Sequence, residues 1–294
     1  MMREIRRVLV CLEFASHDEQ LIRYARFLEK VLSLDRIVFL FVNRTTDLPE
    51  KVRTQISEAT SLSEIKKRVE QIVDQTFESN ETVNVDMEVV TGHNIHEALK
   101  IIRAQKIDLV VAAKNDQRLK SVITATKLSR KSPVSTLIIP KGNIIKFSRI
   151  LVAVDGSESS RKAAEAGIYF ANTAGLRQLI LGRVFNVPYS YVKTGYGVQY
   201  KDFSSWVREM IESSMQSMVS AIDTGELEVS SYVREDQEVV SGVEIMLERM
   251  KGDLLVIGAK GKSFFPSYSL GSTAEEIIFS SHIPVLVVKS NNDL

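Results

Sequence analysis

Cysteine is almost absent from this chain: Cys11 is the only one among 294 residues. A single cysteine excludes an intrachain disulfide and favours a reducing compartment, so we expect a cytoplasmic protein. No apolar run approaches the roughly 18 residues that a membrane span needs. The apolar run after Arg7 is also too short for the core of a signal peptide. The net charge is only +1, so no global field attracts nucleic acid. We therefore expect neither membrane nor nucleic acid as a partner.

The sequence does contain an internal repeat. Three apolar segments occur in the same order in each half: residues 7–13 match 149–155, 108–113 match 253–258, and 133–139 match 284–288. A repeat of this length is typical of a duplicated domain rather than of a solenoid unit. The Pro and Gly residues near position 140 separate the two copies. We expect one domain at residues 1–142 and a second at residues 143–294.

Apolar strands alternate with amphipathic helices in both halves. The second half predicts strands near 149–154, 178–185, 227–233, 253–258 and 284–289, with helices near 159–174, 203–223, 239–250 and 272–280. Short, nearly continuous apolar strands are typical of parallel strands that are covered on both faces. The fold class is therefore α/β, with two tandem doubly wound parallel sheets. Ligands of such sheets bind at the carboxyl ends of the strands, where the strand order reverses.

A set of spaced glycines follows the fourth strand of the second half. The spacing is G-x2-G-x9-G-S, formed by Gly258, Gly261, Gly271 and Ser272. Glycines let the backbone turn tightly and approach an anion, and a helix that begins beyond them offers free N–H groups. This pattern favours a phosphate-binding loop over a simple tight turn.

Other polar residues are predicted to lie near these glycines. Asp155 follows the first strand, and either forms a turn or meets a nucleotide hydroxyl or a phosphate-bound cation. Ser157 or Ser159 is a candidate cap of the next helix. Two lysines, Lys260 and Lys262, either add positive charge to the site or are solvated. Ser272 and Thr273 either cap the last helix, contact phosphate, or do both. Two loops, residues 263–270 and the tyrosine-rich residues 188–200, either cover the ligand or pack against the other half.

The first half has lost the glycine pattern. Ala113 stands where Gly258 stands, Asp116 replaces Gly261, and Glu13 replaces Asp155. Side chains then fill the space for phosphates, so we expect no triphosphate to bind here in the same way. The loop is basic instead, which indicates either a solvated helix face or contact with an acidic partner or nucleic acid; its cations are Lys114, Arg118, Lys120, Lys127, Arg130 and Lys131.

The glycine motif, together with a first strand that ends in Val-Asp-Gly-Ser at residues 154–157, resembles the universal stress protein family. Further similarity lies in Asp-Leu-Leu-Val-Ile-Gly at 253–258 and in Ile-Pro-Val-Leu-Val-Val at 283–288. The resemblance covers nearly the whole chain as a tandem protein. It implies a five-stranded, Rossmann-like sheet in each domain, similar to adenine nucleotide alpha hydrolases, with ATP or AMP/ADP in the crevice and Mg²⁺ accompanying ATP.

Carried over by position, the resemblance implies specific contacts. Asp155 would meet the ribose or phosphates, and the backbone at Ala153 and Val184 would lie by the base. The phosphates would be wrapped by Gly258, Gly261, Gly271, Ser272 and Thr273. The family also pairs domains through the last strand, which implies pairing of residues 134–139 with 285–288 as an intramolecular pseudo-dimer, and it allows dimerisation of the whole chain.

We therefore expect a stress-response regulatory protein that binds an adenine nucleotide in its C-terminal domain and transmits this to an unidentified protein partner. Nucleotide would order the neighbouring loops and shift the population of a partner surface. Two alternatives stay open. A slow ATPase or a phosphoryl or nucleotidyl transferase would need a base, for which Asp155 is the only candidate. A nucleotide-free interaction scaffold would leave the crevice empty.

Overall fold

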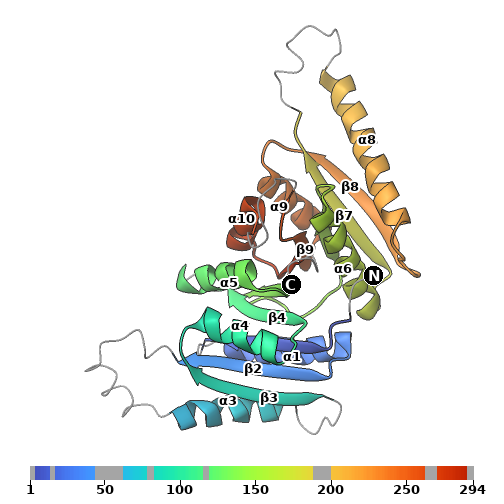
Figure 1. Cartoon of the computed structure of the whole chain (residues 1–294). Helices are drawn as coiled ribbons and strands as arrows, with labels where there is room; N and C mark the ends of the chain where they lie inside the picture. Colours follow the sequence, from blue (N-terminus) through green and yellow to red (C-terminus); the bar gives the residue numbers. More distant parts are fainter. Residues whose placement is uncertain are drawn as a thin grey trace. The chain divides into compact units, whose positions relative to one another are not determined.

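A computed structural model describes residues 4–13, 17–43, 62–77, 83–114, 119–187, 200–261 and 270–289. Within it the chain divides into two compact units, with the change between Lys146 and Phe147. We call the described residues from 4 to 146 the N-terminal unit and those from 147 to 289 the C-terminal unit. Each unit contains helices and strands in alternation along the chain (Figure 1).

The N-terminal unit is built on a five-stranded parallel sheet in the order β3-β2-β1-β4-β5. Its strands are β1 (Arg7–Leu12), β2 (Arg36–Asn43), β3 (Asn84–Thr91), β4 (Leu109–Lys114) and β5 (Ser135–Pro140). Its helices are α1 (Asp18–Leu32), α3 (Leu62–Thr76), α4 (Asn94–Ala104) and α5 (Leu119–Lys131).

The C-terminal unit repeats this order, with its sheet arranged as β8-β7-β6-β9-β10. Its strands are β6 (Ile150–Ala153), β7 (Gln178–Phe185), β8 (Glu228–Glu235), β9 (Leu254–Gly258) and β10 (Val285–Val288). Its helices are α6 (Glu158–Thr173), α8 (Tyr200–Ser220), α9 (Val239–Met250) and α10 (Ser272–Ser280). The predicted fold class is confirmed, and these strands and helices lie within a few residues of their predicted bounds.

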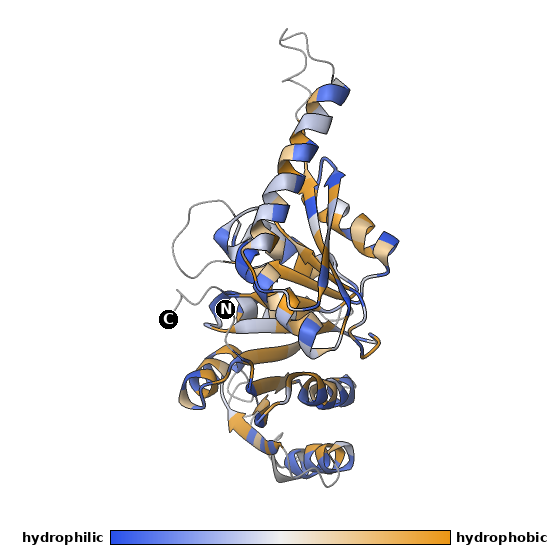
Figure 2. Ribbon diagram, turned by 90° about the vertical axis from the view of Figure 1, so that its right-hand side faces the viewer, coloured by the Kyte–Doolittle hydropathy of each residue, from blue (hydrophilic) through white to orange (hydrophobic). Residues whose placement is uncertain are grey.

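Both faces of each sheet are covered, which explains why the strands are continuous apolar runs. The central strands are hydrophobic along their length, whereas the helices carry a hydrophilic face (Figure 2). In the C-terminal unit, α6 approaches one face so closely that a Cβ on Gly167 would lie 2.4 Å from Val152. The opposite face meets α9, because a Cβ on Gly182 would lie 2.8 Å from the sulfur of Met246. Glycine at these two positions lets helix and sheet come into contact.

In each sheet the central strand is where the strand order reverses. Chain connections run from β6 outward to β7 and β8, and then return to β9 and β10 on the other side of β6. A ligand crevice of such a sheet is expected at this reversal, which here lies at the carboxyl ends of β6 and β9. Among the helices of the described part of the chain, none is both long and apolar enough to cross a membrane.

Candidate functional site

The crevice of the C-terminal unit begins where β6 ends. Ala153 pairs with Gly182 of β7 on one side and with Ile257 of β9 on the other. Beyond it, the amide of Val154 still donates a hydrogen bond to the carbonyl oxygen of Gly182, at 2.9 Å. Asp155 is the next residue, so it lies at the carboxyl edge of the sheet between β7 and β9.

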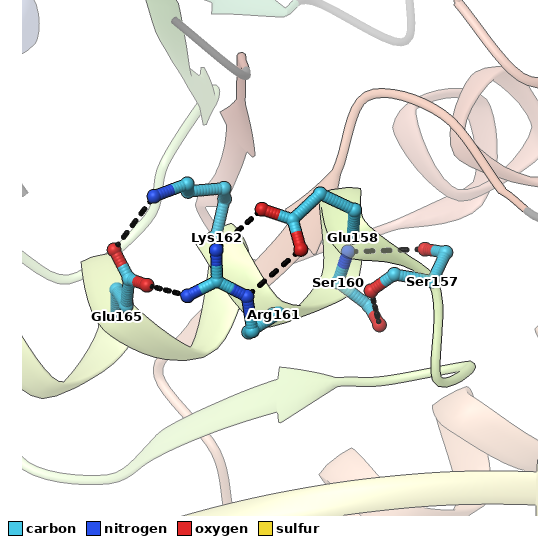
Figure 3. A network of polar contacts seen from close by, with 6 residues as sticks. All are labelled: Ser157, Glu158, Ser160, Arg161, Lys162 and Glu165. Atoms are coloured by element: carbon cyan, nitrogen blue, oxygen red, sulfur yellow. Dashed lines mark hydrogen bonds and ion pairs between the residues drawn. The ribbon is translucent and has the colours of Figure 1, made fainter. Parts of the chain in front are cut away.

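A tight turn connects Asp155 to α6. The amide of Ser157 donates to Oδ1 of Asp155 at 2.8 Å, and Gly156 has a φ of +79°, a conformation that favours glycine. The Ser157 hydroxyl then accepts a hydrogen bond from the amide of Ser160 at 3.1 Å (Figure 3). Ser157 is therefore the N-cap of α6, which settles the choice between the two predicted caps.

Ion pairs fix the first two turns of α6. Arg161 lies between two carboxylates: its Nε donates to Glu158 at 2.8 Å and its Nη2 also donates to Glu158, whereas its Nη1 donates to Glu165 (Figure 3). Lys162 also contacts Glu165, at 3.2 Å. The hydrogen bond from Arg161 lowers the pKa of the Glu158 carboxyl. Glu158 thus stays negative near the positive end of the helix dipole.

Gly258 is required by packing against this helix start. A Cβ at position 258 would lie 2.6 Å from the Ser159 hydroxyl and 2.8 Å from its carbonyl carbon. The same Ser159 hydroxyl accepts a hydrogen bond from the amide of Lys260 at 3.2 Å. Ser159 therefore anchors the loop after β9 instead of capping α6. Sequence reasoning missed this role, since a buried serine beside a glycine has no distinctive spacing.

Of the other two glycines of the motif, Gly261 faces Asp155 and Gly271 lies against the backbone of the loop after β9. A Cβ on Gly261 would lie 3.3 Å from Oδ2 of Asp155, and one on Gly271 would lie 3.6 Å from the amide nitrogen of Gly261. The amide of Gly271 donates to the carbonyl oxygen of Ala259 at 2.8 Å, which ties the start of α10 to the end of β9. Residues far apart in sequence are thereby brought together: the turn at 155, the loop at 259–261 and the start of α10.

The start of α10 differs from its prediction in one respect. Gly271 is the N-cap and provides no side-chain cap, so the prediction that Ser272 or Thr273 caps this helix is wrong. Both hydroxyl residues are exposed in the first turn. The amides of Ser272, Thr273 and Ala274 have no acceptor within the helix, as at any helix start, whereas Glu275 bonds Gly271 at 3.0 Å. Lys260 is half-buried; Lys262 and residues 263–269 lie outside the described residues.

The residues expected beside a base lie on β6 and β7. Ala153 and Val184 are both half-buried near the carboxyl ends of their strands. The Val184 side chain packs toward α9, since a Cβ on Gly242 would lie 2.7 Å from its methyl group. The side chain of Val184 is therefore engaged with α9, and only its backbone is left at the edge of the sheet. Of the tyrosine-rich segment, residues 188–199 lie outside the described residues, and Tyr200 begins α8.

Arg183 is a site residue that the sequence reasoning did not single out. It is half-buried at the end of β7, beside the β6 end that carries Asp155. Burial lowers the pKa of the Arg183 guanidinium, and the charge of Asp155 partly offsets this effect. The two side chains are therefore close enough to interact electrostatically. Within the described ranges, no group of three or more His, Cys, Asp or Glu side chains forms a metal site.

The corresponding edge of the N-terminal unit carries buried polar side chains. Lys114, at the end of β4, is only 1% exposed, so the prediction that it belongs to a solvated basic face is wrong. Nearby, Ser121 donates to the carbonyl oxygen of Ala113 at 3.4 Å. The amide of Glu13 donates to Asp18 at 3.1 Å. Asp116 and Arg118 lie outside the described residues.

Little free volume remains beside these groups. A cavity of about 20 Å³ lies among Cys11, Glu13, Val42, Ala98 and Ala113. That volume holds about one water. Of the predicted basic face, Lys127, Arg130 and Lys131 are exposed on α5.

Comparison with known proteins gives a family match for each half. The model of the universal stress protein family matches residues 4–140 and again residues 146–289. A universal stress protein of Methanocaldococcus jannaschii is 28% identical over 167 residues, covering 55% of this chain and 93% of that protein. One of Thermus aquaticus is 26% identical over 148 residues, covering 49% of this chain and 99% of the relative.

A solved structure also matches both halves together. A universal stress protein of Archaeoglobus fulgidus aligns with a TM-score of 0.67, covering 98% of this chain and 97% of its own. The two sequences are 18% identical, so this likeness concerns the fold.

Proposed function

This chain belongs to the universal stress protein family, and we propose on that basis that its C-terminal unit binds one adenine nucleotide, ATP or AMP/ADP. The nucleotide would lie in the crevice at the ends of β6, β7 and β9. Its base would lie by the backbone of Ala153 and Val184, and its ribose by Asp155. Bound nucleotide would regulate the contact between this chain and a protein partner during a stress response in the cytoplasm.

One observation supports this proposal above the others: Asp155, Gly261 and the start of α10 converge. Gly261 faces Oδ2 of Asp155 with room for little more than a hydrogen, and Gly271 lies against the Gly261 backbone. Because glycine adds no side chain at positions 261 and 271, the loop backbone is left uncovered except by the Asp155 carboxylate. The first turn of α10 adds a positive dipole end next to the loop.

The phosphates would be held mainly by backbone amides and hydroxyls. We assign this role to the amides of Ser272 and Thr273 and to their exposed hydroxyl groups. Gly271 would act differently, because its amide already bonds Ala259 and so fixes the helix start. Gly258 would act through packing on Ser159. Lys260 and Lys262 would add positive charge. Mg²⁺ would bind together with the phosphates, and Asp155 would be its carboxylate ligand from the protein.

The N-terminal unit would bind no nucleotide in this way. Buried Lys114 and the cavity of about 20 Å³ beside Cys11 argue against room for one. We therefore propose one nucleotide per chain. Pairing of residues 134–139 with 285–288, and dimerisation of the whole chain, stay predictions.

Calorimetric titration of the full chain with ATP, AMP and GTP tests this proposal. The decisive variant is Gly261→Asp, which places a carboxylate beside Asp155 and repels phosphate. We expect adenine nucleotides to release heat with the native chain and none with this variant.

A matched control adds the same charge elsewhere. Ser213→Asp lies on the exposed side of α8 and should leave the affinity unchanged. Circular dichroism should show both variants folded. If no nucleotide releases heat with the native chain, the proposal is refuted and a nucleotide-free interaction scaffold is favoured. If Gly261→Asp binds adenine nucleotides as tightly as the native chain, the assigned site is refuted.

A further inference from the structure

Arg183 is a charged group at the crevice whose role the fold does not explain. Three other arginines of the C-terminal unit have clear partners: Arg161 bonds Glu158, Arg234 bonds Asp236 at 3.1 Å, and Arg208 lies over the ring of Phe185. Among the described residues, the Arg183 guanidinium makes no hydrogen bond or close ion pair, and it interacts electrostatically with Asp155. A half-buried guanidinium has five N–H donors to satisfy.

The strand geometry directs this side chain toward the start of α6. Side chains alternate along β7, so Arg183 shares a face with Leu179. Leu179 packs against α6, since a Cβ on Gly167 would lie 3.3 Å from it. The turn that carries Asp155 leads into this same helix. Arg183 and Gly261 thus lie on the two sides of Asp155, one on β7 and the other beyond β9.

This placement matters for the ribose of a bound nucleotide. In Rossmann-type sheets the ribose is met either by an acidic residue, which binds its 2′-hydroxyl, or by a nearby arginine, which accommodates a 2′-phosphate. Asp155 alone would repel such a phosphate. Arg183 supplies the opposite charge, and its planar fork of donors matches two phosphate oxygens at once.

We propose that Arg183 binds a phosphomonoester on the ribose, so that the C-terminal unit prefers adenosine nucleotides carrying a second phosphate at the 2′- or 3′-hydroxyl. This inference rests on the proposed function and specifies its ligand class. AMP and ATP would bind as well, but without using this arginine.

The first half supports the assignment by contrast. β2 and β7 both contain eight residues, so Phe41 of β2 corresponds to Arg183 of β7. Phe41 is buried, and Glu13 stands where Asp155 stands. The half without the glycine motif therefore also lacks the cation. The arginine occurs only in the half that keeps the phosphate-binding pattern.

The test is calorimetric titration of the full chain with AMP, adenosine 2′,5′-bisphosphate and adenosine 3′,5′-bisphosphate. We expect one of the bisphosphates to bind about 10- to 100-fold more tightly than AMP, the range expected for a hydrogen bond between charged groups. In Arg183→Gln this preference should disappear while the affinity for AMP is kept. Arg183→Lys should keep part of the preference, because it keeps the charge but not the fork.

Arg177→Gln is the matched control, because it removes the same charge at the opposite end of β7, where the side chain is exposed. It should keep the full preference. Equal affinity of the native chain for all three nucleotides would overturn this inference and leave the proposed function intact. An equal loss of AMP and bisphosphate binding in Arg183→Gln would overturn it as well. Failure of every nucleotide to bind would overturn both.

Discussion

Replacing Gly258 by alanine should destabilise the C-terminal unit through a direct clash. The new Cβ would lie 2.6 Å from the Ser159 hydroxyl, 2.8 Å from its carbonyl carbon and 2.9 Å from its carbonyl oxygen. The hydroxyl can rotate away, but the two backbone atoms belong to the first turn of α6. Either β9 or α6 must therefore shift, and overpacking of this kind costs about 1–3 kcal/mol.

Urea unfolding measures this effect in the unit concerned. Trp206 is the only tryptophan of the chain and lies on α8, so its fluorescence reports on the C-terminal unit. With a slope of about 2 kcal/mol per molar urea, the midpoint should fall by about 0.5–1.5 M. Circular dichroism provides the second probe.

The control is Gly261→Ala. Its Cβ would lie 3.3 Å from Oδ2 of Asp155, the end of a side chain that can move. We expect a change within about 0.5 kcal/mol in the free energy of unfolding. If Gly258→Ala unfolds at the same urea concentration as the native chain, the close contact between β9 and α6 is refuted.

Three further predictions concern single groups. Desolvation by its surroundings, followed by the charge of Glu13, raises the pKa of the half-buried Cys11 thiol to about 12, so Cys11 should resist alkylation at pH 8 in the native protein and react fully in denaturant; rapid native labelling would contradict the raised pKa. Ser157→Ala should lower the stability of the C-terminal unit by about 1 kcal/mol in urea through loss of the α6 cap, while Ser157→Asn should retain most of it. Hydrogen bonds from the Glu238 backbone and then from Arg234 lower the pKa of Asp236 below 3.8. The stabilisation that Asp236 provides is therefore present at neutral pH and is lost as the pH falls through the lowered pKa. Asp236→Asn should reduce the pH dependence of unfolding below pH 4, and an unchanged pH dependence there would count against these hydrogen bonds.

The fold could be predicted from the sequence because the central strands are buried on both faces. Runs such as Leu254–Gly258 are apolar throughout, and no alternative element suits so short a run between glycines and helices. The internal repeat predicts the same order of strands and helices a second time, from different residues. The convergence of Asp155 with Gly261 followed from the rule that parallel strands end at one edge, since β6 and β9 are neighbours.

Features that depend on packing across the fold were not predictable. Lys114 looked like a solvated loop residue, yet it is buried in its unit, and a charged side chain carries no sequence signal of burial. Ser272 looked like a cap, but the backbone turns one residue earlier, at Gly271. Arg183 was visible as a departure from apolar character at a strand end. Only the pairing of β7 with β6 shows that it lies beside Asp155.

The central claim is that one half of the chain binds an adenine nucleotide and the other does not. Native mass spectrometry of the full chain, with ATP or AMP added in excess, counts bound nucleotides directly. We predict one nucleotide per chain, and none for Gly261→Asp. Two nucleotides per chain would contradict the proposal that the N-terminal unit binds none, and none would contradict the assigned site in the C-terminal unit.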